Sequence, residues 1–442
     1  MSGSMGVSTL IAGMFLTGCA NSLLGKYQVK LCVEDCNTAN PVYFEQPVYQ
    51  TLNMFIGEFF CVLPLLWAWL SSPAKGGRQS YLSRLLARTP TPEGYEPVPA
   101  EPAPAAAEDE EEEGDSDSET ELRVGRPLRG WAVFWMWFPA FFDICGTTLM
   151  NVGLILCPVS IYQMSRGALV LWVGVLSVIF LRHHLYLYQW AALLIVTLGV
   201  ALVGLAGTLI SEALKQGVAL PDIPSDLVLR IATVHMRSDD DPAKVALGVG
   251  LILFAQIFTA SQYVVEEKIM AHYSIEPLAA VALEGTFGGV TTAAAMPFLH
   301  LAFHKKSSYF DMPRGWHQII NNPPVMWASL AIATSIGAFN FFGLSVTSRV
   351  SATTRSTIDT CRTLGIWIVS LAIGWEVLLF PYSLIQLAGF GLLVYGTFVF
   401  NGLVKPVIFP PPPDVHLPHE PELHHSAELP ASIEHGSPGY DA

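Results

Sequence analysis

The sequence predicts an all-α polytopic membrane protein with about ten transmembrane helices. Of its 442 residues, 52% are hydrophobic and 14% are charged, whereas a soluble protein has about a quarter of its residues charged. The mean hydropathy is +0.43. The apolar residues form separate blocks of about 20 residues, the length of helix that crosses a ~30 Å bilayer. These runs do not alternate as the strands of a barrel do, so each span is expected to be a helix.

Ten windows have the length and hydropathy of a span. They are residues 6–25, 49–70, 131–156, 160–181, 187–207, 246–265, 278–301, 324–345, 355–375 and 382–403. The first window contains Leu16-Thr17-Gly18-Cys19, which is similar to a bacterial lipoprotein cleavage site. No Lys or Arg precedes this segment, so the basic region of a signal peptide is missing and we expect a retained span.

The windows divide the chain into six regions. In order, these are the first two helices (1–71), a disordered acidic cytosolic loop (72–129), helices three to five (130–207), a lumenal loop (208–245), a second five-helix group (246–403) and a disordered tail rich in Pro and His (404–442). Composition predicts the disorder, because the 72–129 loop and the tail have too few apolar residues for a core. The Lys and Arg residues of the 72–129 loop favour the cytosolic side.

Charge and motifs exclude several classes of function. Much of the net charge of −14 lies in one acidic run between Glu108 and Glu121, which we interpret as a solvated linker. The sequence has no basic patch or nucleic-acid motif, so nucleic acid is not an expected partner. We find no nucleophile with a base, no phosphate loop and no dinucleotide turn, so neither an enzyme nor a cofactor is expected.

The seven cysteines do not have the spacing of a metal site, and no metal is expected. Cys32 and Cys36 lie together in the loop after the first window. A disulfide between them would form if this loop faces an oxidising compartment, and two free thiols are the alternative.

The two halves of the chain are related in sequence. A shift of 196 or 197 positions pairs Arg166 with Arg362, Gln189 with Gln386 and Gly199 with Gly396. Near its start, each half also has an acidic residue beside a glycine, Gly57-Glu58 in one and Glu284-Gly285 in the other. Five spans is an odd number, so the two copies would be inverted in the membrane, as in carriers that work by alternating access.

Polar residues within the spans are the candidates for solute binding or coupling, because a charge at mid-bilayer costs at least ~2.5–3.5 kcal/mol. The candidates are Glu58, Asp143, Gln163, Arg166, Glu284, Asn340, Asp359 and Arg362. Glu58 or Glu284 would exchange a proton, whereas Arg166 or Arg362 would hold a carboxylate or phosphate of the solute. Arg355, near a helix end, shares one helix face with Asp359 and Arg362. The alternative is that these charges pair only to fix helix packing.

Two motifs carry a family resemblance. Residues 160–167 (SIYQMSRG) resemble the fourth-helix motif of the chloroquine-resistance-transporter-like and F-type solute carrier 35 proteins, within the EamA-like drug/metabolite transporter superfamily. The ninth-helix signature of these proteins is similar to residues 351–355 (SATTR), Asp359, Arg362-Thr363 and residues 374–376 (GWE). Shorter matches are residues 57–59 (GEF) and residues 266–268 (EEK), the latter placed after the sixth window.

The resemblance implies ten helices in an inverted five-plus-five repeat. It also implies a substrate cavity lined by helices one to four and six to nine, with helices five and ten at the periphery. Proteins of this kind reside in lysosomal, vacuolar or other endomembranes, and their substrates range from nucleotide sugars to amino acids, peptides and drugs.

We therefore expect a secondary active transporter that moves a small polar or anionic solute across an endomembrane by alternating access, with proton coupling as one version. The vacuole, lysosome or Golgi is the expected location, and a mitochondrial membrane is an alternative. A non-transporting membrane scaffold or receptor subunit and a nucleotide-sugar exchanger are the alternative functions. The expected partners are a small-molecule solute and the lipid bilayer, with a homodimer as a further option.

Overall fold

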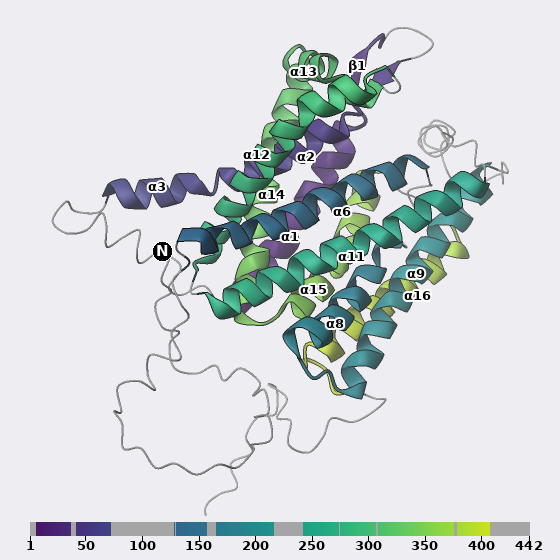
Figure 1. Cartoon of the computed structure of the whole chain (residues 1–442). Coiled ribbons are helices and arrows are strands. Elements are labelled where there is room, and N and C mark those ends of the chain that lie inside the picture. Colours follow the sequence, from purple (N-terminus) through teal and green to yellow (C-terminus); the bar gives the residue numbers. More distant parts are fainter. Residues whose placement is uncertain are drawn as a thin grey trace, which may run out of the picture.

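The computed structural model is a helical bundle with one small two-stranded sheet among the described residues (Figure 1). It describes residues 6–36, 41–71, 128, 130–156, 165–215, 242–273, 275–305, 308–374 and 378–406. The predicted acidic run, Gln163 and most of the Pro/His-rich tail lie outside the described residues. The predominance of long helices confirms the predicted all-α polytopic class.

Each of the ten predicted windows contains a helix within the described ranges. In the first half these helices are α1 (Val7–Gln28), α2 (Pro47–Phe59), α3 (Val62–Ser71), η1 (Gly130–Met136), α6 (Trp137–Leu156), α8 (Ala168–Leu181) and α9 (Leu187–Lys215). In the second half they are α11 (Pro242–His272), α12 (Pro277–Phe303), α14 (Pro323–Arg349), α15 (Ala352–Ala372) and α16 (Tyr382–Phe400). Outside the windows are β1 (Cys32–Glu34), β2 (Val42–Tyr43), η2 (Ser308–Phe310) and α13 (Met312–Ile320).

The bundle has the surface of an integral multi-pass membrane protein. Eight helical segments among the described residues are long and apolar enough to cross a bilayer. Two other helices occupy the remaining windows: α8, which has 14 residues, and α15, whose first turns contain three charged side chains. Large apolar side chains point outward, with Trp67 75% and Leu301 77% exposed. Such a surface is suited to lipid contact and is rare on soluble monomers.

Several helix pairs join the two halves. Among them are α1 with α14, α2 with α12, α2 with α14, α6 with α11, α8 with α11, α8 with α15, and α9 with α16, and α6 and α11 are seen side by side in Figure 1. Small residues permit the closest of these contacts. A Cβ on Gly199 would lie 2.7 Å from the carbonyl oxygen of Gly389, and a Cβ on Gly389 would lie 2.8 Å from that of Gly199.

The second window differs from the predicted single helix. It is broken at Phe60 and Cys61 into α2 and α3, and Figure 1 shows α3 running outward from the bundle. The reason is Pro64, which has no N–H to donate to the carbonyl of Phe60 and whose ring crowds that carbonyl. The proline is tolerated in the first turn of α3 but not in the middle of a continuous helix.

The sixth window also differs, because α11 continues for seven residues beyond the predicted end at 265. The apolar periodicity persists there, and Ile269 and Met270 are buried in a core cluster with Leu344 of α14. As a consequence, Glu266 lies inside a packed helix and not in a loop.

Candidate functional site

Four carboxylates from four different helices come together inside the bundle. They are Glu58 of α2, Asp143 of α6, Glu266 of α11 and Glu284 of α12, and they are 0%, 9%, 1% and 2% exposed. All four are close enough for each charge to act on the other three. We call these four residues the carboxylate cluster. Two of its helices belong to each half of the chain, so the cluster lies between the halves.

Neutral side chains donate hydrogen bonds to three members of the cluster. The amide of Asn340 on α14 donates to Oε1 of Glu58 over 2.5 Å. The amide of Gln262 on α11 donates to Oε1 of Glu284 over 2.9 Å, and the hydroxyl of Thr147 donates to Oδ1 of Asp143 over 2.9 Å. Asn340, a candidate from the sequence, is therefore in direct contact with Glu58.

The fourth member, Glu266, pairs with Arg355 of α15. Nη1 of Arg355 donates to Oε2 of Glu266, and the two side chains are 1% and 0% exposed. The guanidinium also lies over the ring of Tyr263, 4.0 Å from its centroid. Arg355 is in the first turn of α15, which begins where the hydroxyl of Ser351 accepts from the backbone N–H of Thr354. Helix initiation thus sets the depth at which the guanidinium enters the bundle.

Glycine allows α2 to approach its neighbours at the level of Glu58. A Cβ on Gly57 would lie 2.1 Å from the carbonyl oxygen of Ala333 on α14. On the opposite side, a Cβ on Gly285 of α12 would lie 2.5 Å from the Cβ of Glu58. Any side chain at either position would push the helices apart, so the two glycines hold Glu58 and Glu284 near each other.

Asp359 and Arg362 form a separate pair on α15. Nε of Arg362 lies 3.2 Å from Oδ1 of Asp359, at the i, i+3 spacing. The guanidinium is 5.1 Å from the ring centroid of Phe339, and the backbone carbonyl of Arg362 contacts the sulfur of Cys19 on α1. Arg166 lies just before α8 and is partly buried.

The side chains of the carboxylate cluster are enclosed in this conformation, since each is at most 9% exposed. Two depressions lie elsewhere on the described part of the protein, and neither is lined by a member of the cluster. One of about 500 Å³ lies between α1 and α14 and is lined by Thr17, Trp327, Leu330, Ala331, Thr334, Ser335 and Ala338. The other, of about 10 Å³, lies between α9 and α16. A solute would reach the cluster only in a different conformation.

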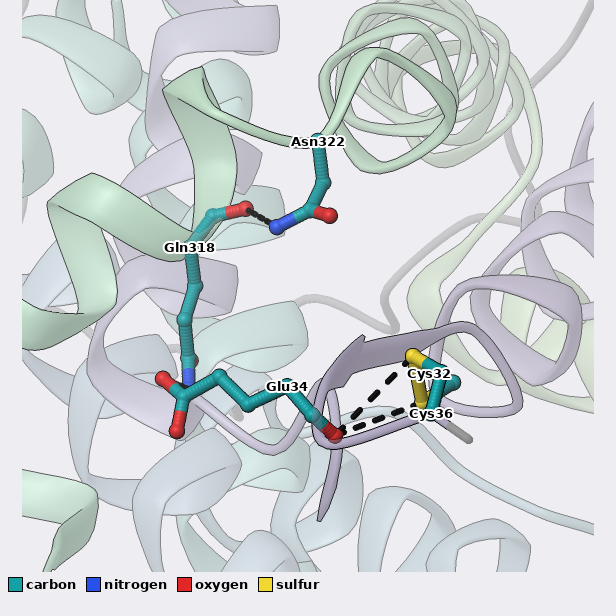
Figure 2. The surroundings of a disulfide bond; sticks show 5 residues. All are labelled: Cys32, Glu34, Cys36, Gln318 and Asn322. Carbon is teal, nitrogen blue, oxygen red and sulfur yellow. Dashed lines mark hydrogen bonds between the residues drawn. A yellow bond between two sulfur atoms is a disulfide. The ribbon is translucent and has the colours of Figure 1, made fainter. Parts of the chain in front are cut away.

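A second group of polar contacts joins the halves outside the candidate spans, at the end of the bundle where Figure 1 shows β1 beside α13. Figure 2 shows the disulfide between Cys32 and Cys36, which lies around the turn that follows β1. Strand β1 pairs with β2. The carboxylate of Glu34 accepts from Nε and Nη2 of Arg314 over 3.1 and 2.6 Å, and from the amide of Gln318 over 2.8 Å. The hydrogen bonds from Arg314 lower the pKa of Glu34. We call Glu34, Arg314 and Gln318 the clamp.

Sequence reasoning missed part of each site. The sequence places Glu266 after the sixth span, whereas it lies within α11. Arg355 lies near a helix end as predicted, but its pairing with Glu266 and the contacts of the clamp are not apparent from the sequence. The signal for Glu266 is its i, i+4 spacing from Gln262, which continues the helix beyond residue 265. The clamp has no local signal, because Glu34 and Arg314 are far apart in the sequence.

Comparisons with known proteins identify the family. No protein-family model matches the chain. A solved structure superimposes with a TM-score of 0.49 at 11% identity, covering 90% of this chain and 96% of its own. Solute carrier family 35 member F6 of Rattus norvegicus is 31% identical over 407 residues, which is 90% of this chain and 89% of that protein.

Two further relatives give the same level of similarity. Solute carrier family 35 member F6 of Homo sapiens is 31% identical over 408 residues, 90% of each chain. An uncharacterized protein of Schizosaccharomyces pombe is 31% identical over 399 residues, 89% of this chain and 96% of its own. Identity at this level, sustained along nearly the whole of each protein, shows that the chain belongs to the solute carrier 35 family.

Proposed function

We propose that this protein is a secondary active transporter that moves a small polar solute across an endomembrane by alternating access, with protons as the coupling ion. The observation that carries the proposal is the carboxylate cluster, which is enclosed between the two halves. Buried ionisable groups in membrane proteins are costly and mark pathways of solutes or protons. Family membership supports a transporter over an enzyme.

Charge balance supports the proton as coupling ion. Arg355 contacts the cluster, and its single positive charge faces four carboxylates. Charges that are shielded from water must be paired or neutralised. In the closed conformation, therefore, the carboxylates without a cationic partner hold protons, and they release them when the site opens to water.

The helix contacts support two inverted repeats. A shift of 197 positions carries Gly199 to Gly396 and Ala192 to Gly389. The contact between Gly199 and Gly389 therefore corresponds to a contact between Gly396 and Ala192. This second contact is present, because a Cβ on Gly396 would lie 2.9 Å from the carbonyl oxygen of Ala192. Such an exchange of contacts is expected of two halves related by a pseudo-two-fold axis, as in alternating-access carriers.

The disulfide supports an orientation and an endomembrane location. Disulfides persist in oxidising compartments such as the lumen of the secretory pathway. We infer that the Cys32–Cys36 loop faces the lumen. Residues 72–129 follow the next span and so face the cytosol, which agrees with their Lys and Arg residues. A lysosomal, vacuolar or Golgi membrane fits this arrangement.

Transport in proteoliposomes tests the proposal. We expect solute uptake in a panel screen to respond to a pH gradient, and we expect Glu58→Gln and Glu284→Gln to remove this response because each loses its exchangeable proton. Glu276→Gln is the matched control, since Glu276 is the N-cap residue of α12 and its side chain makes no capping hydrogen bond. Stimulation by an internal nucleotide monophosphate would instead indicate nucleotide-sugar exchange.

The closed interior favours a second candidate, a non-transporting scaffold that keeps the fold. The four members of the cluster are at most 9% exposed, which is what a solid structural core would give. A scaffold would move no solute under any gradient, and the two glutamine variants would then change stability alone. That outcome would remove the transporter proposal.

A further inference from the structure

The disulfide encloses the residue whose carboxylate joins the two halves. Cys32 and Cys36 are four positions apart in the sequence, and Glu34 is midway between them. Both sulfurs lie close to the backbone carbonyl oxygen of Glu34, at 3.4 and 3.9 Å. In Figure 2 the side chain of Glu34 points away from the sulfurs and towards Gln318 of α13. The S–S bond therefore fixes the backbone from which the carboxylate of the clamp extends.

The turn closed by the disulfide has a backbone conformation that non-glycine residues adopt rarely. Asp35 has a φ of 52°, in the left-handed region. A residue with a side chain stays in this region when the surrounding structure holds it there. Once the S–S bond is cut, Asp35 is free to adopt a negative φ. That change would redirect the adjacent Glu34.

Helix α13 is short and depends on the first half for its position. It has nine residues, whereas isolated helices shorter than about 12–15 residues are marginal in water. Glu34 accepts three of the described hydrogen bonds that join α13 to the first half, from Arg314 and Gln318. Gln46 and Tyr49 donate one each to α13. Loss of the Glu34 contacts would therefore remove more than half of this set.

The two sulfurs of the disulfide differ in their access to water. Cys36 is exposed, whereas Cys32 is half-buried in β1 beside β2. Both lie outside the candidate spans. A thiolate reduces a disulfide by attacking one of its sulfurs directly, so access decides which sulfur is attacked. A thiolate that arrives from water would meet Cys36 first.

We propose that Cys36 is a site of thiol–disulfide exchange with a small soluble thiol, and that reduction of the Cys32–Cys36 bond releases α13 from the first half. The thiolate bonds to Sγ of Cys36, the S–S bond breaks, and Cys32 leaves as a thiolate that takes up a proton. A second thiolate then bonds to the sulfur of the first and displaces Cys36, which is also protonated. Two electrons pass to the cysteines, and the two small thiols become a disulfide. This exchange would occur whether or not the protein moves a solute.

Hydrogen exchange on the full-length protein in detergent measures the release of α13. Dithiothreitol should reduce the bond and speed amide exchange in Met312–Ile320 about two- to fivefold, the factor that corresponds to the loss of an exposed ion pair. Exchange in the distant helices α9 and α16 should be unchanged. Faster exchange confined to residues 31–43 would overturn the proposal, because reduction would then not reach α13. Faster exchange throughout the protein would also overturn it, since the bond would then act only on global stability.

The variant Glu34→Ala separates the release of α13 from cleavage of the bond. In this variant α13 should exchange at the rate of the reduced protein before any reductant is added. Dithiothreitol should still cleave the bond but should not speed exchange in α13 further. A further increase would mean that reduction acts on α13 by another route and would overturn the role of Glu34. If Glu34→Ala does not fold, Arg314→Gln removes the same ion pair from the other side.

The variant Glu45→Ala is the matched control. Glu45 accepts a hydrogen bond from Tyr309, also between the two halves, but it lies outside the loop that the disulfide closes. In this variant α13 should respond to dithiothreitol as it does in the unchanged protein. Loss of the response would mean that the effect is not specific to the disulfide loop and would count against the proposal.

Trapping with glutathione tests the assignment of Cys36. The protein is incubated with millimolar glutathione and quenched with acid, and mass spectrometry then locates the attached tripeptide. We expect the mixed disulfide on Cys36, because its sulfur is the accessible one. Attachment to Cys32 in place of Cys36 would overturn the assignment. A bond that survives both glutathione and dithiothreitol in the folded protein would overturn the exchange site altogether.

Discussion

The protein contains two Arg–Glu pairs that are chemically alike but lie in different surroundings. Arg355 and Glu266 are 1% and 0% exposed inside the bundle, whereas Arg314 and Glu34 are 35% and 36% exposed at its end. The buried pair lies within the second half of the chain, and the exposed pair joins the two halves. Solvent screens the exposed pair and not the buried one. The loss of unfolding free energy on breaking each pair should therefore differ several-fold.

The difference suggests a division of roles. Removing one partner of a buried pair leaves a charge without water or counter-charge and costs about 3–5 kcal/mol, whereas an exposed pair contributes ~0.2–1 kcal/mol. The clamp can therefore break and re-form at small cost, as the proposed alternating access would require. The charges of the cluster must be balanced in every closed conformation.

The largest effect is expected from breaking the buried pair. Arg355→Ala should lower the free energy of unfolding by about 3–5 kcal/mol, because Glu266 stays buried without its partner. Urea unfolding in detergent measures the loss. The double variant Arg355→Ala with Glu266→Gln should recover part of it, and equal losses in the single and double variants would contradict this account of the pair.

The glycine contact beside the cluster should rank next. Gly57→Ala puts a Cβ against the backbone of Ala333 and is expected to cost roughly 3 kcal/mol, the upper end of overpacking losses. Gly250→Ala is the control, since a Cβ on Gly250 would have no neighbour within 4 Å. The control should be neutral or stabilising by up to about 1 kcal/mol. Similar thermal unfolding of the two variants would show that α2 and α14 do not pack closely.

The disulfide beside the clamp should have an intermediate effect. Replacing Cys32 and Cys36 together by Ser is expected to cost up to about 2 kcal/mol, because the loop that the bond closes is short. Reductant should lower the unfolding temperature of the unchanged protein to that of the double variant and leave the variant unaffected. An equal response of both proteins to reductant would mean that the bond does not form.

The exposed pair should give the smallest effect, and one that depends on pH. Arg314→Ala is expected to cost ~0.2–1 kcal/mol, less at high salt. Because the hydrogen bonds from Arg314 lower the folded-state pKa of Glu34 below its unfolded value, the stabilisation is complete above the unfolded pKa of about 4.3 and is lost as the pH falls through the lower folded value. The unchanged protein should exceed Arg314→Ala in unfolding free energy by the same amount at about pH 7 and at about pH 5. This difference should vanish in stronger acid. A decline that begins near neutral pH would implicate another group.

The same contrast explains which site residues could be predicted from the sequence. Glu58 and Glu284 are isolated acidic residues in long apolar runs. Because a charge at mid-bilayer has a high free-energy cost, such residues can be picked out as candidates from the sequence alone. Glu266 is in a charged, polar stretch where hydropathy falls, and the sixth window ends one residue before it. Arg355 is the first residue of the ninth window, so hydropathy places it at a helix end but does not reveal its partner. Their importance comes from helix packing, which buries both.

The sequence by itself determined the membrane class, the positions of the helices and the family, because hydropathy and motif residues are local properties of the chain. Only the tertiary structure decided that four carboxylates from different helices share one enclosed site with Arg355. The direction of α3 after Pro64, and the hydrogen bonds that Glu34 accepts from Arg314 of α13, were also decided only there. Such contacts depend on how close two helices can approach. That distance is set by residues such as Gly57 and Gly285 on surfaces that meet only after folding.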